Sequence, residues 1–130
     1  LEQTLLELAS VVSDPTPKLI LADELEAITE PGAGARIIAG MLLAARAQKD
    51  TSMMLVTHLA PAIIEASGVD DFRVDGIEAR GLDSDLELIV DRTPIRNHLA
   101  RSTPELIVKR LVERSNGHAK SLFGDILRMF

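Results

Sequence analysis

Two adjacent acids, Asp23 and Glu24, are the residues of this sequence best placed to do chemistry. They follow Lys18 and a run of four apolar residues, 19–22. Such a continuous apolar run is typical of a strand buried on both faces of a parallel sheet. Open α/β sheets bind ligands at the carboxyl ends of their strands, where one carboxylate can hold Mg²⁺ on a nucleotide and the other can orient or deprotonate a water. The plainer interpretation is a strand that leaves the core through two solvated acids.

One histidine is expected to share this site. A second short apolar strand, residues 52–57, ends in His58, and a helix is predicted between the two strands. In such a strand–helix–strand unit the carboxyl ends of both strands lie at the same edge of the sheet, so the imidazole should lie near the two carboxylates. A histidine can donate a hydrogen bond to a phosphate and can carry charge. Taken alone, His58 is more often an ordinary loop histidine.

Other kinds of site have little support in the sequence. His98 and His118 have no third ligand at metal-binding spacing, and no serine lies in a nucleophile-elbow pattern. A phosphate-binding loop is also missing, because none of the eight glycines is followed by lysine and no GxxxxGK[ST] motif exists. Without that loop and its lysine, the β- and γ-phosphates of a nucleotide have no cradle. We therefore expect the chain alone not to hydrolyse ATP.

The first half of the chain reads as alternating helices and strands. Apolar residues at helical spacing predict three helices, over residues 1–12, 35–49 and 61–66. With the two apolar strands between them, this order is typical of an α/β fold, a parallel sheet with crossover helices. The segment 25–34, which contains Pro31 and two glycines, is expected to be a loop, either an active-site element or a plain connector.

The second half changes character. Antiparallel strands are expected near residues 72–92, with Asp75-Gly76 as a hairpin turn or a bulge. A helix is predicted to start at Thr103-Pro104, with the threonine as its cap, and to end near residue 115. A further helix over 118–130 has an apolar side that must dock on its own domain or on a partner. The strands expected here are residues 72–74, 77–79 and 86–90.

Composition sets broad limits on the protein class. The 130 residues make one domain or part of one, and 46% hydrophobic with 26% charged residues is ordinary for a globular protein. No apolar run approaches the roughly 18 residues of a membrane span, and the first residues lack the pattern of a signal peptide, so we expect neither. The absence of cysteine excludes a disulfide framework and fits the cytoplasm, where we expect the protein. A net charge of −6 argues against an autonomous nucleic-acid binder, and the initial leucine suggests a fragment.

Together these residues resemble the carboxyl-terminal half of an ATP-binding-cassette (ABC-type) P-loop ATPase domain, and most of all the MutS family of DNA mismatch-repair proteins. In that family the Walker B strand ends in Asp-Glu, a threonine follows five residues after the glutamate, and a later strand closes in Thr-His. The matching residues are Asp23-Glu24, Thr29 and Thr57-His58. Residues 86–91 correspond to the family's last strand and 102–107 to a helix start near its end. Glu26, Ala27 and Ile28 depart from the family's Gly-Arg-Gly.

The resemblance implies particular roles for these residues in an ATPase that uses ATP and Mg²⁺. Glu24 would activate the attacking water and His58 would contact the γ-phosphate as catalytic residues. Asp23 would help to place Mg²⁺ through water, and Thr29 and Thr57 would contribute to nucleotide binding. The nucleotide would lie between two subunits of a homodimer, while other domains of the parent protein would bind DNA and none would enter a membrane.

The resemblance also divides the chain. Residues 1–102 would be the carboxyl-terminal half of the ATPase domain, carrying its Walker B strand, D-loop and H-loop, and residues 103–130 a helical region that helps to hold the dimer. Two alternatives stay open. One is another ABC-type ATPase, a transporter subunit or a chromosome-structure protein. The other is a non-catalytic interaction module, in which the acid pair and the histidine are incidental and the tail mediates assembly.

Overall fold

The computed structural model of the protein describes residues 1–130, apart from the side chain of Ile28. The chain forms two compact units, residues 1–73 and 74–130. This division describes how compactly the chain packs. The boundary expected after residue 102 separates two functional regions, and it stays a prediction. Within the described residues, no helix is both long enough and apolar enough to cross a membrane.

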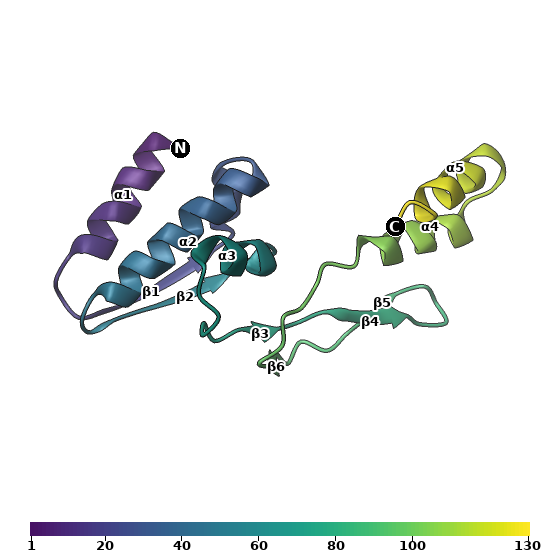
Figure 1. Ribbon diagram of the computed structural model, residues 1–130. Coiled ribbons are helices and arrows are strands. Elements are labelled where there is room, and N and C mark those ends of the chain that lie inside the picture. Colours follow the sequence, from purple (N-terminus) through teal and green to yellow (C-terminus); the bar gives the residue numbers. More distant parts are fainter. The chain divides into compact units, whose positions relative to one another are not determined.

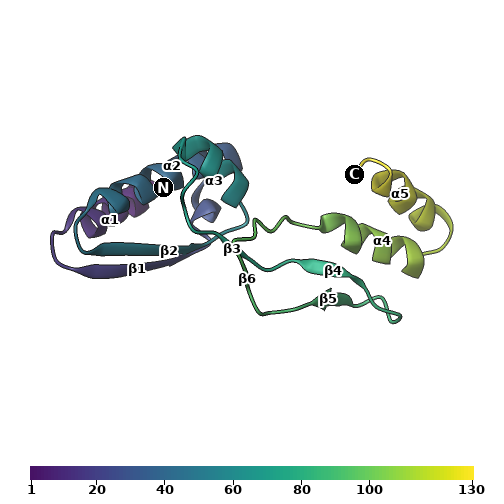
Figure 2. The same ribbon diagram turned by 60° about the horizontal axis from the view of Figure 1, so that its bottom comes forward.

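The first unit alternates helices with two parallel strands, as predicted. β1 and β2 are hydrogen-bonded neighbours, with Lys18 opposite Thr51 and Asp23 opposite Val56. The connection between them runs through α2, and Figures 1 and 2 show all three helices of the unit on one side of the two strands. The elements in chain order are α1 (Glu2–Ser13), β1 (Lys18–Asp23), the 3₁₀ helix η1 (Leu25–Ile28), α2 (Pro31–Ala47), β2 (Thr51–Val56) and α3 (Ala60–Ser67).

The core of this unit lies between the helices and one face of the sheet. The small side chains of Ala35 and Ala39 on α2 let α3 approach closely. Ile38 of α2 and Ile63 of α3 are buried together in this cluster. A second cluster joins Val12 of α1, Ile20 of β1 and Ala45 of α2. Burial of these aliphatic side chains supplies the main driving force that holds the helices on the strands.

The opposite face of the sheet is open, which corrects one expectation. β1 and β2 alternate between covered and exposed residues instead of being buried on both faces. Within residues 1–73 the helices cover one face only, so the apolar side chains on the other face remain in solvent. These residues form what we call the open sheet face: Leu19 (62% exposed), Leu21 (68%), Met54 (63%) and Val56 (61%).

The expected loop over 25–34 is also corrected, because α2 begins at Pro31. The carboxylate of Glu30 accepts hydrogen bonds from the backbone N–H groups of Gly32 (3.3 Å) and Ala33 (2.7 Å), which otherwise have no partner in a first helical turn. Proline at the first helical position needs no such partner. This cap outweighs the two glycines, and the preceding residues form η1 rather than an open loop.

The second unit contains short antiparallel strand pairs and a helical hairpin. β3 pairs with β6, and β4 pairs with β5, which confirms the expected antiparallel pairing. Helices α4 and α5 pack against one another. The chain therefore has three two-stranded sheets, one parallel and two antiparallel, rather than the one mostly parallel sheet that was expected. The elements are β3 (Asp75–Gly76), β4 (Ala79–Leu82), β5 (Leu88–Val90), β6 (Ile95–Arg96), α4 (Pro104–Arg114) and α5 (Gly117–Leu127).

Asp75-Gly76 is neither a hairpin turn nor a bulge. These residues form β3 itself, opposite Arg96 and Ile95. A Cβ added at Gly76 would lie 2.5 Å from the backbone oxygen of His98 and 2.8 Å from the backbone nitrogen of Ala100. Glycine is needed here because another stretch of backbone passes too close for a side chain.

Three boundaries in this unit differ from those expected. Strands begin at residues 75 and 79 rather than at 72 and 77. β5 begins at Leu88, because Leu86 has a left-handed φ of 62° and belongs to the turn between β4 and β5. α4 starts at Pro104 as predicted, but the Thr103 side chain accepts no capping hydrogen bond from the backbone N–H groups of its first turn.

Candidate active site at the ends of β1 and β2

The two parallel strands deliver Glu24 and His58 to the same edge of the sheet. The register places Asp23 opposite Val56, and the backbone N–H of Glu24 continues the pairing by donating to the Val56 carbonyl at 3.1 Å. Just beyond, the Nε2 atom of His58 lies 3.9 Å from a carboxylate oxygen of Glu24. The structure thus brings Glu24 and the imidazole together, as the strand–helix–strand pattern predicts.

The backbone of Glu24 is unusual. Its φ of 52° and ψ of 40° lie in the left-handed region, which few non-glycine residues adopt. This conformation ends β1 and turns the chain directly into η1. Strained backbone of this kind gathers at functional sites, where the surrounding structure holds it in place.

The Glu24 carboxylate and the His58 imidazole are both open to solvent. The side chains of Glu24 and His58 are 66% and 76% exposed, so an ion pair between them adds little stability. Asp23 is exposed as well, at the end of β1. The groups are therefore accessible to a ligand or to another protein surface, and their arrangement comes from the backbone that carries them.

Glu26 connects the two halves of this site, a role that the sequence alone does not predict. One of its carboxylate oxygens, Oε1, accepts hydrogen bonds from the Thr57 hydroxyl (2.8 Å) and from the backbone N–H of His58 (2.9 Å). The Thr57 hydroxyl in turn accepts from the backbone N–H of Leu59 at 3.0 Å. The only sign of this role in the sequence is that a third acid, Glu26, follows the acid pair by two residues.

The pKa of Glu26 reflects these contacts. Burial raises it, whereas hydrogen bonds from the backbone of His58, its own backbone N–H and the Thr57 hydroxyl, together with the charge of the His58 imidazole, lower it; the net result is a pKa below the ordinary value. Its second oxygen, Oε2, is buried and has no hydrogen-bond partner among the described residues. The carboxylate is therefore kept charged by the donors on one of its oxygens.

The remaining predicted residue, Thr29, lies between η1 and α2 and is half-buried. Its backbone N–H is 3.4 Å from the carbonyl oxygen of Glu26. This contact closes the 3₁₀ turn that follows the acid pair. The nucleotide-binding roles expected for Thr29 and Thr57 stay predictions.

The carboxylates of Asp23 and Glu24 are suitable partners for Mg²⁺ in the presence of a nucleotide. Mg²⁺ usually binds one or two carboxylates together with water and substrate phosphates. Within the described part of the chain, no group of three or more His, Cys, Asp or Glu side chains is placed to hold one metal ion. The expected role of Asp23 in placing Mg²⁺ stays a prediction.

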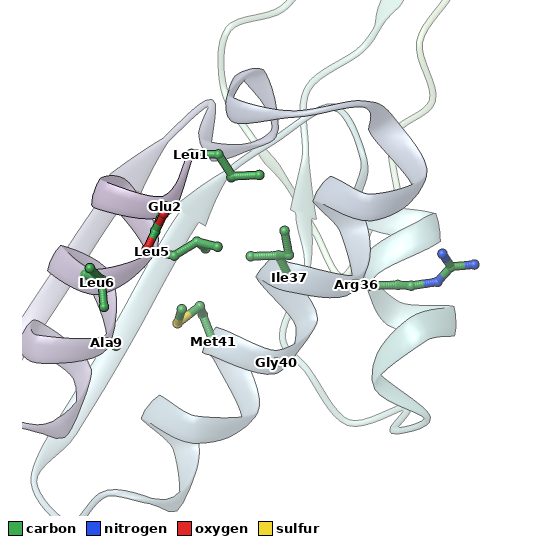
Figure 3. Close-up of a pocket in the computed structure, with 9 residues that line it drawn as sticks. All are labelled: Leu1, Glu2, Leu5, Leu6, Ala9, Arg36, Ile37, Gly40 and Met41. Atoms are coloured by element: carbon green, nitrogen blue, oxygen red, sulfur yellow. The ribbon is translucent and has the colours of Figure 1, made fainter.

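An apolar groove lies elsewhere, between α1 and α2. It encloses about 690 Å³, and Figure 3 shows the side chains of Leu5 and Ile37 pointing toward each other across it while Arg36 points away. Its lining is largely apolar and carries none of the residues at the ends of β1 and β2. Such a groove suits an apolar side chain better than a phosphate.

The chain is similar in sequence to a known protein, the DNA-binding protein MutS2 of Pyrococcus furiosus. The two are 44% identical over 129 residues, which are 99% of this chain and 22% of the relative. The chain thus spans about one fifth of that relative's length. No family model matches the chain, and no solved structure matches it.

Proposed function

Because the chain is related to the MutS family along nearly its whole length, we propose that it supplies one half of an ATP-hydrolysis site within a larger DNA-processing ATPase. The observation that carries this proposal is the pairing of Glu24 with His58, 3.9 Å apart at the carboxyl edge of two parallel strands. A carboxylate and an imidazole at this edge suit phosphate chemistry. The relationship to MutS2 favours this class over a transporter subunit or a chromosome-structure protein.

Each residue has a distinct task in the proposed site. Glu24 orients and deprotonates the attacking water, a role for which an accessible carboxylate is suited. His58 donates a hydrogen bond to the γ-phosphate, and Asp23 helps to hold Mg²⁺. When bound, Mg²⁺ supplies charge stabilisation on the phosphate oxygens. Thr29 and Thr57 border the site and contribute to nucleotide binding.

The other half of the proposed site must come from other polypeptide. The sequence has no GxxxxGK[ST] motif, so the backbone cradle and the lysine for the β- and γ-phosphates lie in another segment or chain. A net charge of −6 suggests that DNA is bound by other domains as well. We further propose that the active form is a homodimer held in part by α4 and α5.

The test is hydrolysis of ATP with Mg²⁺ by a larger protein that carries this segment, with and without the substitution Glu24→Gln. We expect Glu24→Gln to retain nucleotide binding and to lower turnover by roughly 10²- to 10⁴-fold, because general-base catalysis contributes on that scale. Glu30→Gln is the matched control, since Glu30 caps α2 in the same segment. Turnover unchanged by Glu24→Gln, or turnover by the 130-residue chain alone, would contradict the proposal.

The open sheet face favours a second candidate, a non-catalytic interaction module. Four large apolar side chains on that face are more than 60% exposed, and apolar surface of this kind marks interaction sites. In this case Glu24→Gln has no effect on the larger protein, whereas Leu21→Lys disrupts its assembly. The two candidates thus predict opposite results for Glu24→Gln: a large loss of turnover for the ATPase and no effect for the interaction module.

A further inference from the structure

The loop after the acid pair is tied to the strand end that carries the histidine. Oε1 of Glu26 accepts the Thr57 hydroxyl at 2.8 Å and the His58 backbone N–H at 2.9 Å. These are charge-assisted hydrogen bonds, which are stronger than neutral ones. They join residues that lie more than thirty positions apart in the sequence, so they fix two segments relative to each other.

The same contact extends to the start of α3. Leu59 precedes α3 and has no side-chain oxygen with which to cap it. Its backbone N–H instead donates to the Thr57 hydroxyl at 3.0 Å, and that hydroxyl donates to Glu26. A negative charge near this helix N-terminus is favourable. Glu26 and Thr57 therefore form a chain of hydrogen bonds that ends at Leu59, the residue that precedes α3.

The position of the His58 imidazole depends on this backbone anchor. The ring is 76% exposed, and its contact with Glu24 at 3.9 Å is longer than a hydrogen bond. Attraction between the two groups is thus too weak to hold the ring in place. The backbone of Glu24 is fixed by its bond to the Val56 carbonyl, and the backbone of His58 is fixed by Glu26.

We propose that Glu26 is the positioning residue of this site, and that its carboxylate holds the His58 backbone so that the imidazole stands beside Glu24. The catalytic meaning of this placement rests on the proposed ATPase function, whereas the placement itself does not. A movement of the segment after the acid pair would move His58 with it. Glu26 therefore couples that segment to the group expected to contact the γ-phosphate.

Substitutions at Glu26 in the 130-residue chain test this proposal. Glu26→Gln keeps an oxygen acceptor at the same reach, Glu26→Asp shortens the side chain by one methylene, and Glu26→Ala removes the acceptor. The matched control is Glu30→Ala, because Glu30 also accepts two backbone hydrogen bonds but from the first turn of α2. All four variants leave Glu24 and His58 in the sequence.

The first measurement is amide hydrogen exchange, followed by NMR. We expect Glu26→Ala to accelerate exchange at the His58 amide by roughly five- to thirtyfold, the factor for a lost hydrogen bond. Glu26→Gln restores protection, and Glu30→Ala accelerates exchange at Gly32 and Ala33 instead. Unchanged exchange at His58 in Glu26→Ala overturns the proposal. Should that variant not fold, protection retained in Glu26→Gln and lost in Glu26→Asp supports it, and equal protection in both overturns it.

The second measurement separates positioning from mere support of α3. The ring resonances of His58 are recorded before and after Glu24→Gln, in the wild-type chain and in each Glu26 variant. We expect a clear response in the wild type, a response reduced by at least roughly half in Glu26→Ala, and recovery in Glu26→Gln. A side chain that only stabilises the start of α3 leaves the response unchanged, and that result overturns the proposal.

Neither measurement uses a nucleotide, so failure of the ATPase proposal is distinguishable from failure of this one. In a larger protein that hydrolyses ATP, Glu26→Ala lowers kcat by roughly tenfold or more with a smaller change in KM, since misplaced catalytic groups affect the chemical step most. Glu26→Gln recovers most of the rate. If Glu24→Gln leaves hydrolysis unchanged while the NMR results hold, the ATPase function fails and Glu26 is still confirmed as the residue that places His58.

Discussion

At the scale of single residues, Glu24 combines an exposed carboxylate with a backbone conformation that glutamate rarely adopts. Its φ of 52° costs about 1–2 kcal/mol relative to ordinary backbone. The parallel pairing at Val56 and the 3₁₀ turn that follows hold the residue in this conformation. The side chain is thereby directed toward the end of β2, where His58 emerges.

The depressed pKa of Glu26 predicts how this contact depends on pH. A carboxylate whose folded pKa lies below its unfolded pKa stabilises the folded state above the unfolded value, and this stabilisation is lost as pH falls through the folded value. The neighbouring imidazole of His58 favours the charged form and so acts in the same direction. We expect the contribution to be complete above about pH 4.3, the ordinary glutamate value, and to fade below it.

The measurement is the free energy of unfolding of the wild-type chain and of Glu26→Gln, determined by urea at a series of pH values. The difference between the two should be constant at neutral pH and should shrink as pH falls below about 4.3. A difference that grows on acidification would contradict the assigned direction of the pKa shift. Glu30→Gln is the control, because it shows how the loss of a glutamate charge at another position changes the pH dependence of the free energy of unfolding.

The residue pattern predicts the pairing of Glu24 with His58, because residues that end parallel strands must meet at one edge. It does not predict the role of Glu26. That role depends on a contact across 31 positions, between Glu26 and Thr57, which exists only once α2 has brought the two strands together. A spacing rule within one strand or helix contains no information about such a contact.

At the scale of elements, glycines have opposite meanings in two places. Gly76 lies in β3 where an added Cβ would meet backbone atoms of His98 and Ala100 at 2.5 Å and 2.8 Å. Gly40 lies inside α2, and an added Cβ there would have no neighbour within 4 Å among the described residues. One glycine is required by packing, whereas the other lowers helix stability.

This contrast predicts opposite effects of two alanine substitutions. Gly76→Ala should destabilise the second unit by about 1–3 kcal/mol or more, because rigid backbone must move. Gly40→Ala should stabilise α2 by about 0.5–1 kcal/mol. Urea unfolding followed by circular dichroism measures both changes. Equal effects of the two substitutions would contradict the close packing of residues 98–100 against Gly76 in β3.

Elements were predicted well where one local signal dominates, as at Pro104, where α4 begins. They were predicted less well where signals compete. The glycines after Pro31 indicate a loop, but the carboxylate of Glu30 supplies two hydrogen bonds that start α2 there. Leu86 looks like a strand residue, yet its left-handed backbone places it in a turn.

At the scale of the whole molecule, the open sheet face is the main feature that a single strand pattern did not predict. The apolar runs of β1 and β2 suggest burial on both faces, but Leu21 is 68% and Met54 63% exposed. The helices of residues 1–73 cover one face only. Whether an apolar run is covered depends on the amount of polypeptide available to cover it, and the run itself does not encode that amount.

Exposure of this face predicts self-association of the chain. We expect the weight-average mass in analytical ultracentrifugation to rise with concentration, because contiguous apolar surface favours association. Leu21→Lys should reduce this rise and change the free energy of unfolding by no more than about 0.5 kcal/mol, as is usual for exposed positions. Lys substitution of Leu122, which is exposed on α5, is the comparison. A larger effect there would assign association to the helical hairpin.

The open sheet face also means that the thermal unfolding midpoint of the chain can report the binding of a polypeptide to this face. Any polypeptide that binds this face in the folded state, and not in the unfolded chain, raises the midpoint by mass action. Candidate segments can therefore be ranked by titration against the chain in a thermal-shift assay, with Leu21→Lys as the blank. A segment that raises the midpoint of the wild type and not of the blank is one that binds the open sheet face.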